Sequence, residues 1–267
     1  MAERIQKILS QWGIASRRQA EKMILAGRIK LNSRIAKLGD KVDLSVDQLE
    51  VDDQIVQEHL RPSKVYLLVN KPLGVVSTCD DPQNRNTVLE LLPNNLRFGQ
   101  GIHPVGRLDI NSTGALLLTN DGALTLNLTH PRYHLPKTYR VVIDGCLDNH
   151  QLELWRRGII LSQRKTLPAT VKVLKIKANQ MSLEIILTEG RNRQIRRVAE
   201  YFGYKVLSLH RIAIASITLQ NATGKNLFSG KHRHLTTAEV EFLRKTLKKP
   251  ADLKLIRQIP ITKENRL

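Results

Sequence analysis

The sequence predicts an α+β protein with a small N-terminal domain and a larger, strand-rich second domain. A helical stripe of apolar residues opens the chain, and predicted strands outnumber predicted helices after residue 65. The two kinds of element do not alternate regularly, as they would in a doubly wound parallel sheet. With 267 residues, the chain is long enough for two domains, each with its own core.

The N-terminal domain, residues 1–60, is predicted to start with two short helices. Apolar residues at i, i+3, i+4 and i+7 mark the buried face of the first: Ile5, Ile8, Leu9 and Trp12. Gly13 ends this helix. Ser16 is the expected N-cap of the second helix, with Gln19 completing a capping box. Short strands are expected over 28–32 and 41–44.

Basic residues dominate this domain and the chain as a whole. Lys and Arg number 43 against 24 Asp and Glu, which gives a net charge of +19. An excess of this size implies a polyanionic partner, with nucleic acid as the first candidate. Residues 1–41 hold ten bases and three acids, whereas residues 42–60 hold six acids and no base. We expect a group of exposed bases to contact phosphates, although an ordinary solvated surface is the alternative for any single one: Arg17, Arg18, Lys22, Arg28 and Lys30.

Other classes of protein are disfavoured by the same sequence. No apolar segment approaches the length of a membrane-spanning helix, and the N-terminus lacks the hydrophobic region of a signal peptide. No basic amphipathic helix with a Trp, Phe or Leu face indicates binding to a membrane surface. Two cysteines are too few for a disulfide framework, and neither they nor the eight histidines show metal-ligand spacing. We therefore expect a soluble intracellular protein without a metal centre.

The second domain is predicted to run from residue 65 to residue 245, after a linker over 61–64. Runs rich in β-branched residues predict its strands: 65–69, 115–119, 137–145, 169–177, 181–190 and 205–219. A short helix is expected over 122–129, and apolar spacing predicts another over 195–202. Residues 246–267 carry six bases and two acids, and we expect a flexible tail that either helps to hold RNA or only aids solubility.

An acidic residue lies unusually close to the predicted core of this domain. Asp109 follows Arg107 and Leu108 in a turn just before the apolar run at 115–118. A solvated turn residue would explain the aspartate, since aspartate is favoured in turns. The alternative is that the fold positions its carboxylate for chemistry. The local pattern leaves both interpretations open.

Six segments of the chain resemble motifs of known proteins. The stretch ERIQKILSQWGIASRRQAEKMILAGRIKLN resembles the small RNA-binding domain named after ribosomal protein S-four. Further along, the chain is similar to the RsuA/RluB family of ribosomal RNA pseudouridine synthases in LLVNKPLGVVST, HPVGRLDINSTGALLLTNDG, KTYRVVIDG, LTEGRNRQIRRVAEYFGYKVLSLHRI and SGKHRHLTTAE. The resemblance covers residues 3–245. The combination of Gly-Arg-Leu-Asp with Gly-Arg-Asn-Arg-Gln-Ile-Arg-Arg makes it highly specific.

The resemblance implies an enzyme that isomerises uridine to pseudouridine in ribosomal RNA. It also implies a catalytic domain built on a mixed, largely antiparallel β-sheet flanked by helices. The reaction breaks the bond from ribose to the base nitrogen and remakes it to carbon five of the same base, so it needs no cofactor. The family's catalytic carboxylate corresponds to Asp109. Whether it attacks the ribose, attacks the base or removes a ribose proton is left open by the sequence.

The family also implies roles for residues around this aspartate. Arg196 would pair with Asp109 and keep it ionised, against the alternative of a surface helix arginine. Tyr139 would pack its ring on the target base, although strands favour tyrosine in any case. Arg107 would occupy the space left by the flipped nucleotide, or form a salt bridge at its turn. Ile195 would line the base pocket, and core packing explains it almost equally well.

Four further basic residues of these motifs are expected to contact the RNA backbone: Lys71, Arg191, Arg193 and Arg197. The chain departs from the family in one place. Where the family often has Asn-Thr-x-Gly-Leu after the aspartate, this chain has Ser112 and Ala115 in place of the threonine and the leucine. The serine keeps the hydroxyl group, so the catalytic assignment is unaffected.

The target RNA is predicted less firmly than the reaction. The stretch STCDDPQNRNTVLELLP is most similar to the large-subunit, RluB-type branch, which implies a uridine near the peptidyl-transferase region of 23S rRNA, with 16S rRNA as the alternative. We expect a bacterial-type cytoplasmic monomer that binds ribosomal RNA, free or in a pre-ribosomal particle. A non-catalytic ribosome-assembly factor is the other hypothesis, but such a chain should have lost Asp109, Tyr139 or Arg196.

Overall fold

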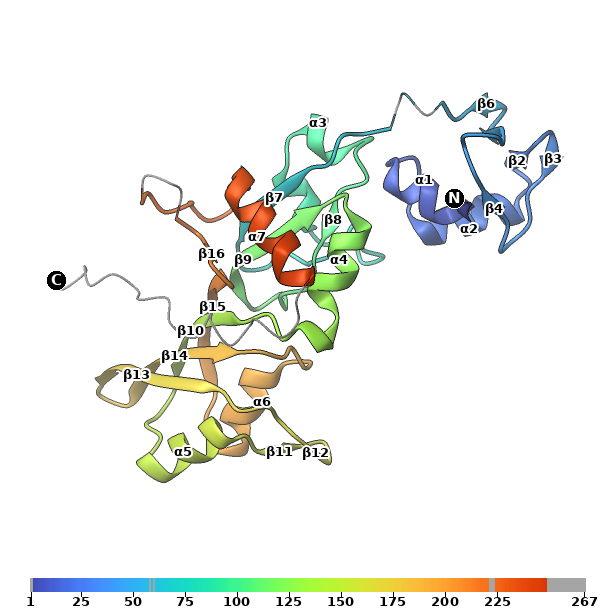
Figure 1. Cartoon of the computed structure of the whole chain (residues 1–267). Helices are drawn as coiled ribbons and strands as arrows, with labels where there is room; N and C mark the ends of the chain where they lie inside the picture. The colour runs from blue at the N-terminus through green and yellow to red at the C-terminus, as the bar shows by residue number, and fades with distance from the viewer. Residues whose placement is uncertain (1, 58, 60, 221–223, 249–267) are drawn as a thin grey trace.

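The computed structural model describes residues 2–57, 59, 61–220 and 224–248. An N-terminal domain, blue in Figure 1, is joined by an extended segment to a larger domain that contains the main sheet. Each domain has its own cluster of buried apolar residues, one in the N-terminal domain and two in the larger one. The two domains touch where the end of the first helix meets the loop at 99–101, since a Cβ built on Gly13 would lie 2.5 Å from the carbonyl carbon of Gly99.

The N-terminal domain packs two helices against short strands. The helices are α1 (Ile5–Gln11) and α2 (Arg17–Leu25). Four strands form one sheet in the order β3 (Arg34–Ile35), β2 (Ile29–Leu31), β5 (Leu49–Val51) and β6 (Gln54–Ile55), while β1 (Glu3–Arg4) pairs with β4 (Lys41–Val42). Ser16 caps α2 by accepting a hydrogen bond of 3.2 Å from the amide of Gln19. The return bond of the predicted capping box is not among the hydrogen bonds of the described residues.

Nine strands of the described chain form the sheet of the larger domain. Seven of them follow one path, in the order β13 (Thr170–Lys177), β14 (Gln180–Leu187), β10 (Lys137–Ile143), β15 (Val206–Ile214), β9 (Thr113–Thr119), β7 (Tyr66–Lys71) and β17 (His232–His234). β16 (Ile217–Thr218) pairs with β15, and β8 (His103–Pro104) pairs with β9. Only the pair β9–β15 is parallel. A separate hairpin joins β11 (Ile160–Leu161) to β12 (Arg164–Lys165).

Helices cover both faces of this sheet. On one face, α5 (Asn149–Arg157) and α6 (Gln194–Tyr201) bury Leu152, Trp155 and Val198 against β10, β13 and β14. On the other face, α4 (Gly122–Thr129) and α7 (Thr237–Lys248) bury Leu124 and Leu243 against β7 and β9. Figure 1 shows the two pairs at opposite ends of the domain. Three short helical segments complete it: η2 (Val88–Leu91), α3 (Asn94–Arg97) and η3 (Pro131–Tyr133).

The two halves of the sheet meet at a glycine. β9 and β15 pair over only two positions, Thr113 with His210 and Gly114 with Arg211. Gly114 has a φ of +107°, and a Cβ at this position would lie 2.2 Å from the carbonyl oxygen of Arg211. Only glycine allows such a close approach of two backbones at this φ. The short contact lets the strands on either side diverge, and the candidate site lies where they do.

The α+β fold class predicted from the sequence is confirmed, as is the helix over 122–129. The sequence analysis missed α5 and α7. α7 reaches Lys248, three residues beyond the predicted domain end at 245, and the rest of the expected tail, 249–267, lies outside the described residues. Both missed helices carry start signals. Asp148 and Gln151 form a capping box at α5, and Thr236 and Glu239 exchange the same pair of bonds at α7.

Candidate active site

A cavity of about 370 Å³ opens where the halves of the main sheet diverge. One wall comes from the turn at 105–109 and the chain at 128–135, and the other comes from β10, β15 and the segment at 187–195. The cavity brings together six of the site residues predicted from the sequence. Four were expected to act on the target nucleotide, namely Arg107, Asp109, Tyr139 and Ile195, and two to contact the RNA backbone, namely Arg191 and Arg193. Residues that lie far apart in the sequence therefore share one concave site, which is the usual form of a binding or catalytic pocket.

Asp109 lies half-buried on a turn that is held in place from several sides. Its carbonyl accepts a hydrogen bond of 2.9 Å from the amide of Ser112. The preceding residue, Leu108, exchanges two bonds with the hydroxyl of Ser77, and the carbonyl of Ile110 accepts a bond of 3.0 Å from Gly74. Among the described residues, no hydrogen bond or ion pair engages the Asp109 carboxylate. The fold thus fixes the backbone and leaves the carboxylate free to face the cavity.

The structure corrects the expected role of Lys71. Its side chain is 0% exposed, and its ammonium group donates a hydrogen bond of 2.8 Å to the carbonyl of Pro72. A group buried in this way cannot contact an RNA backbone. Burial lowers the pKa of Lys71 to about 8, and the nearby charge of Asp109 opposes this shift. Lys71 is therefore a buried cation beneath the candidate catalytic carboxylate.

Arg196 makes its hydrogen bonds near Asp109 with backbone carbonyl groups. Its guanidinium donates to the carbonyl of Asn111 at 2.6 Å and to that of Val206 at 3.0 Å. Burial, followed by the charge of Arg193, lowers the pKa of Arg196, whereas Asp109 raises it. No ion pair within 4.0 Å joins Arg196 to Asp109 in the described structure. The expected pairing therefore takes the form of a longer-range attraction, combined with a direct hold on the turn that follows the aspartate.

Tyr139 and Ile195 supply apolar walls. Tyr139 is 9% exposed on β10, where it lies opposite Ile185 of β14 and Arg211 of β15. Ile195 is 4% exposed in the first turn of α6. Both line the cavity, so a flat ring could pack against them. Arg107 is exposed at the edge of the cavity, two residues before Asp109, and this position is open to an incoming nucleic acid.

Several polar residues that were not predicted as site residues also line the cavity, among them Ser112, Lys137 and Arg211. Arg211 is 4% exposed and uses its Nε to bond the carbonyl of Ala115 at 2.6 Å. Lys137 donates to the carbonyl of Leu135 at 2.9 Å. Lys137 lies two residues before Tyr139, and this period-two spacing on a strand was a signal that could have placed it on the same face. Nothing in the linear pattern marks Arg211 as buried.

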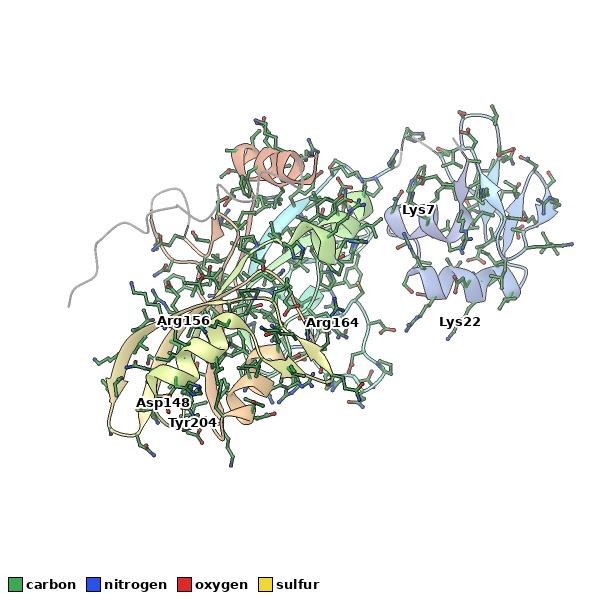
Figure 2. The ribbon with its side chains drawn as sticks, turned by 60° about the horizontal axis from the view of Figure 1, so that its bottom comes forward. Lys7, Lys22, Asp148, Arg156, Arg164 and Tyr204 are labelled. Atoms are coloured by element: carbon green, nitrogen blue, oxygen red, sulfur yellow. The ribbon has the colours of Figure 1, made fainter. Side chains whose placement is uncertain are left out.

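The basic residues near α6 divide into two groups. Arg191 is held internally, because it pairs with Glu189 at 3.0 Å and donates to the carbonyls of Arg164 and Lys165 on the β11–β12 hairpin. Arg193 is exposed in the left-handed conformation, with φ of +49°, and Arg197 donates to the hydroxyl of Ser162. Figure 2 shows Arg164 on the hairpin. Of the expected contacts in this segment, Arg193 is the most open to RNA.

The basic residues predicted to contact RNA in the N-terminal domain also fall into two groups, those in ion pairs and those without one. Arg28 pairs with Asp52 at 2.6 Å, and Lys30 pairs with Asp53 at the same distance. Three others are exposed and take part in no ion pair of the described residues: Arg17, Arg18 and Lys22. All three belong to α2, and Figure 2 shows Lys22 extending from the domain surface. These three bases are therefore available for phosphate contacts in a way that Arg28 and Lys30 are not.

The described part of the chain has neither a membrane-spanning helix nor a cluster of metal-ligating side chains. None of its helices is both long enough and apolar enough to cross a membrane. Within the same residues, no group of three or more His, Cys, Asp or Glu side chains is placed to hold a metal ion.

Two family models match the chain. The model of the RNA pseudouridylate synthases covers residues 65–201, about half of the chain, and includes Asp109, Tyr139 and Arg196. The model of the S4 domain covers residues 3–47. The S4 match lies within the N-terminal domain, and the synthase match lies within the larger domain.

Curated relatives and a solved structure agree with these models. The chain is 40% identical to the ribosomal large subunit pseudouridine synthase B of Bacillus subtilis, over 91% of this chain and 96% of that protein. It is 39% identical to an RNA pseudouridine synthase of Aquifex aeolicus, over 92% and 96% of the two chains. A crystal structure of a pseudouridylate synthase aligns with a TM-score of 0.64 and 29% identity, over 90% of this chain and 99% of the other. On this evidence, the chain belongs to the RNA pseudouridylate synthase family and carries an S4 domain at its N-terminus.

Proposed function

We propose that this protein isomerises a uridine of large-subunit ribosomal RNA to pseudouridine, with Asp109 as the catalytic carboxylate. The observation that supports this most strongly is the position of Asp109. It is a half-buried carboxylate without a described hydrogen-bond partner, in a cavity that it shares with Tyr139 and Ile195. Relatives named ribosomal large subunit pseudouridine synthase B, among them one from Escherichia coli that is 34% identical over 94% of this chain, support the choice of RNA.

The proposed chemistry needs an ionised carboxylate next to the sugar. The cations of Lys71 and Arg196 both interact electrostatically with Asp109. Asp109 then acts on the ribose or the base while the bond from carbon one of the ribose to the base nitrogen breaks. The base turns within the cavity and bonds again through carbon five. The concave site would leave the reactive intermediate less exposed to water than a flat surface would.

Tyr139, Ile195 and Arg107 are proposed to hold the substrate. A base within structured RNA must leave its stack before a carboxylate can reach its sugar. Tyr139 and Ile195 would then pack on the faces of the flipped base, and the hydroxyl of Tyr139 would help to move the proton of carbon five. Arg107 lies exposed at the edge of the cavity, where it can fill the space that the flipped nucleotide leaves.

The S4 domain is proposed to supply most of the affinity for RNA. Its exposed bases Arg17, Arg18 and Lys22 form the phosphate-contacting surface, together with Arg193 near the catalytic cavity. Since both functions are present in one chain, a monomer is sufficient. The proposed setting is the cytoplasm of a bacterial cell, where the substrate is either free ribosomal RNA or a pre-ribosomal particle.

The test is isomerisation of ribosomal RNA that carries no modifications. Uridines labelled with tritium at carbon five release tritium when they become pseudouridine, and carbodiimide treatment followed by primer extension then locates the product. We expect release with the wild-type protein, none with Asp109→Asn, and a product in the large-subunit RNA. Asp80→Asn is the matched control, because Asp80 is exposed and lies outside the cavity.

Three outcomes would contradict the proposal in different ways. A product in 16S rRNA would move the target to the small subunit while leaving the chemistry intact. Equal release by wild type and Asp109→Asn would remove Asp109 from its role. Tight RNA binding without release, from naked RNA and from pre-ribosomal particles alike, would favour the non-catalytic assembly factor.

A further inference from the structure

Two cations that line the cavity from strands of the main sheet have no acidic partner among the described residues. Arg211 and Lys137 both line it, and neither takes part in an ion pair of the described residues. Arg211 is 4% exposed, and its Nη2 atom is buried without any hydrogen-bond partner. A buried donor left unpaired costs free energy, and native structures contain few of them. Because Arg211 lines the cavity, an unpaired donor on its side chain indicates a ligand group that would bind next to it.

Strand register places the two cations around Tyr139. Arg211 of β15 lies directly opposite Tyr139 of β10, and Lys137 precedes Tyr139 by two positions on the same strand face. The side chains of all three residues therefore border one part of the cavity. Apolar residues line the same cavity beside them: Leu117, Leu209 and Ile214. Paired cations within an apolar wall suit a flat, anionic ring.

Ser112 adds a further group without a partner. Its side chain is almost completely buried at 1% exposure, and its hydroxyl has no hydrogen-bond partner. It precedes by two residues the glycine that pairs with Arg211, so it approaches the cavity from β9 while Lys137 approaches from β10. Burial and then the charge of Arg211 lower the pKa of Lys137 to about 8. Lys137 is therefore still mostly charged at neutral pH, and an anion beside it would restore its ordinary pKa.

On the basis of the proposed function, we propose that Arg211 and Lys137 stabilise the uracil anion that leaves the ribose during the reaction, with Ser112 donating to one of its oxygens. When the bond from carbon one of the ribose to N1 breaks, both bonding electrons stay with the base, and the Asp109 carboxylate bonds to the ribose carbon. The negative charge of the base then spreads over N1, O2 and O4. When carbon five bonds to the ribose carbon, the bond to Asp109 breaks and the negative charge returns to its carboxylate. The proton of carbon five is lost and N1 gains one, so no atom is gained or lost overall.

Stabilisation of this kind acts mainly on the transition state. The uridine that enters is neutral, so the two cations gain little from binding it. They gain more as charge moves onto the ring, and a preorganised donor aimed at developing charge is among the largest single contributions to catalysis. The pair differs in this respect from the exposed bases of α2, which would contact phosphates equally before and during the reaction.

The first experiment compares Lys137→Met with Lys172→Met. Both changes remove one positive charge, but Lys172 is exposed on β13, outside the cavity. We expect Lys137→Met to lower the single-turnover rate on saturating RNA by about 100-fold, with RNA affinity changed by less than about 2-fold. Lys137→Arg should recover most of the rate, and Lys172→Met should behave as the wild type. An unchanged rate in Lys137→Met, or a loss of RNA affinity that accounts for the loss of rate, would overturn the proposal.

A second experiment does not depend on turnover. The analogue 5-nitrouracil resembles the detached base and ionises near neutral pH, whereas uracil stays neutral. Ligand-observed NMR on the full chain should show that the wild type prefers 5-nitrouracil and that Lys137→Met and Arg211→Lys lose this preference. Equal binding of both rings by the wild type would overturn the inference. If the wild type isomerises no ribosomal RNA, the proposed function fails, and this binding result still decides whether the cavity holds an anionic ring.

Discussion

Lys71 is a buried residue that interacts with the candidate site although its own side chain does not reach the surface. Its ammonium group is fully buried, has the carbonyl of Pro72 as its hydrogen-bond partner, and interacts with Asp109. Burying a charge is costly, and the lowered pKa expresses that cost. In return, Lys71 places a positive charge close to the Asp109 carboxylate. The buried charge of Lys71 therefore lowers the stability of the fold and places a cation close to Asp109.

The buried charge of Lys71 predicts that the stability of the fold depends on pH. Below pH 8 both the folded and the unfolded chain carry the Lys71 charge, and the folded chain bears the full cost of burying it. Between about pH 8 and 10.5 the folded chain loses this proton while the unfolded chain keeps it, so the contribution of Lys71 to the free energy of unfolding rises. We expect a rise on the order of 3 kcal/mol across this window in wild type relative to Lys71→Met. Denaturant titrations of both proteins at several pH values measure it.

The same variant separates stability from catalysis. Lys71→Met removes the buried charge, so it should unfold at higher denaturant concentration than the wild type at neutral pH. It should also isomerise RNA more slowly, because Asp109 loses its buried cation. Parallel pH profiles of unfolding for the two proteins would show that Lys71 carries no such cost. A variant as active as the wild type would remove its electrostatic role.

At the scale of elements, the close contact of β9 and β15 shapes the cavity. Gly114 permits that contact through its φ of +107° and its lack of a Cβ. We predict that Gly114→Ala lowers the free energy of unfolding by about 2 kcal/mol or more, because the new methyl group would collide with the backbone of Arg211. Activity should fall as well, since the strand that carries Arg211 must move. Chemical denaturation and tritium release measure the two effects.

Gly74 offers a matched control for this prediction. It has a similar positive φ, of +80°, but a Cβ there would meet nothing within 4 Å. Gly74→Ala should therefore cost only the backbone strain, about 1 kcal/mol. If the two variants are equally stable, the collision with Arg211 is not what fixes Gly114.

The elements also show what could be predicted from sequence and what could not. Strong apolar periodicity and turn residues were sufficient for the helix over 122–129 and the strand at 115–119. α5 and α7 were missed although their capping signals are present, because their apolar faces are narrow and their surfaces charged. Within the site, motif resemblance found Asp109 and Tyr139. The burial of Lys71 and Arg211 depends on how strands from distant parts of the chain converge, and no linear pattern carries that information.

At the scale of the whole molecule, the basic residues are not equally available for binding RNA. Many bases are neutralised locally by acids, as Arg28 is by Asp52. The bases of α2 are exposed without such partners in the described structure: Arg17, Arg18 and Lys22. Binding of RNA through phosphates releases counterions, so affinity should fall steeply as salt rises.

This difference predicts the effect of each base on salt dependence. Replacing Arg17, Arg18 or Lys22 with Gln should reduce the log–log slope of RNA affinity against salt by about 0.7 to 0.9 per residue. Arg28→Gln should change the slope less, because Asp52 already neutralises that charge. Fluorescence anisotropy titrations at several salt concentrations provide the slopes. Equal slopes for all four variants would mean that RNA displaces the Arg28–Asp52 ion pair or avoids α2 altogether.

The contact between the two domains determines what removal of the first should do. α1 meets the loop at 99–101 through backbone atoms, and a Cβ on Gly101 would lie 2.6 Å from the carbonyl oxygen of Ser10. The cavity and both apolar cores of the second domain contain none of the described residues among the first 60. We therefore predict that deletion of residues 1–60 weakens RNA binding by about 100-fold or more, through the loss of phosphate contacts.

The same truncation should keep slow isomerisation on saturating RNA, within about 10-fold of the full chain, because every proposed catalytic group remains. Circular dichroism and thermal unfolding establish that the truncated chain is folded before its rate is measured. Gly101→Ala in the full chain is the finer test, since it separates the domains without removing any base. It should weaken binding less than the deletion does, because α2 can still reach the RNA through the linker. A folded truncation without any turnover would instead assign the S4 domain a part in the chemistry, and would point to the loop at 99–101 as the route by which it acts.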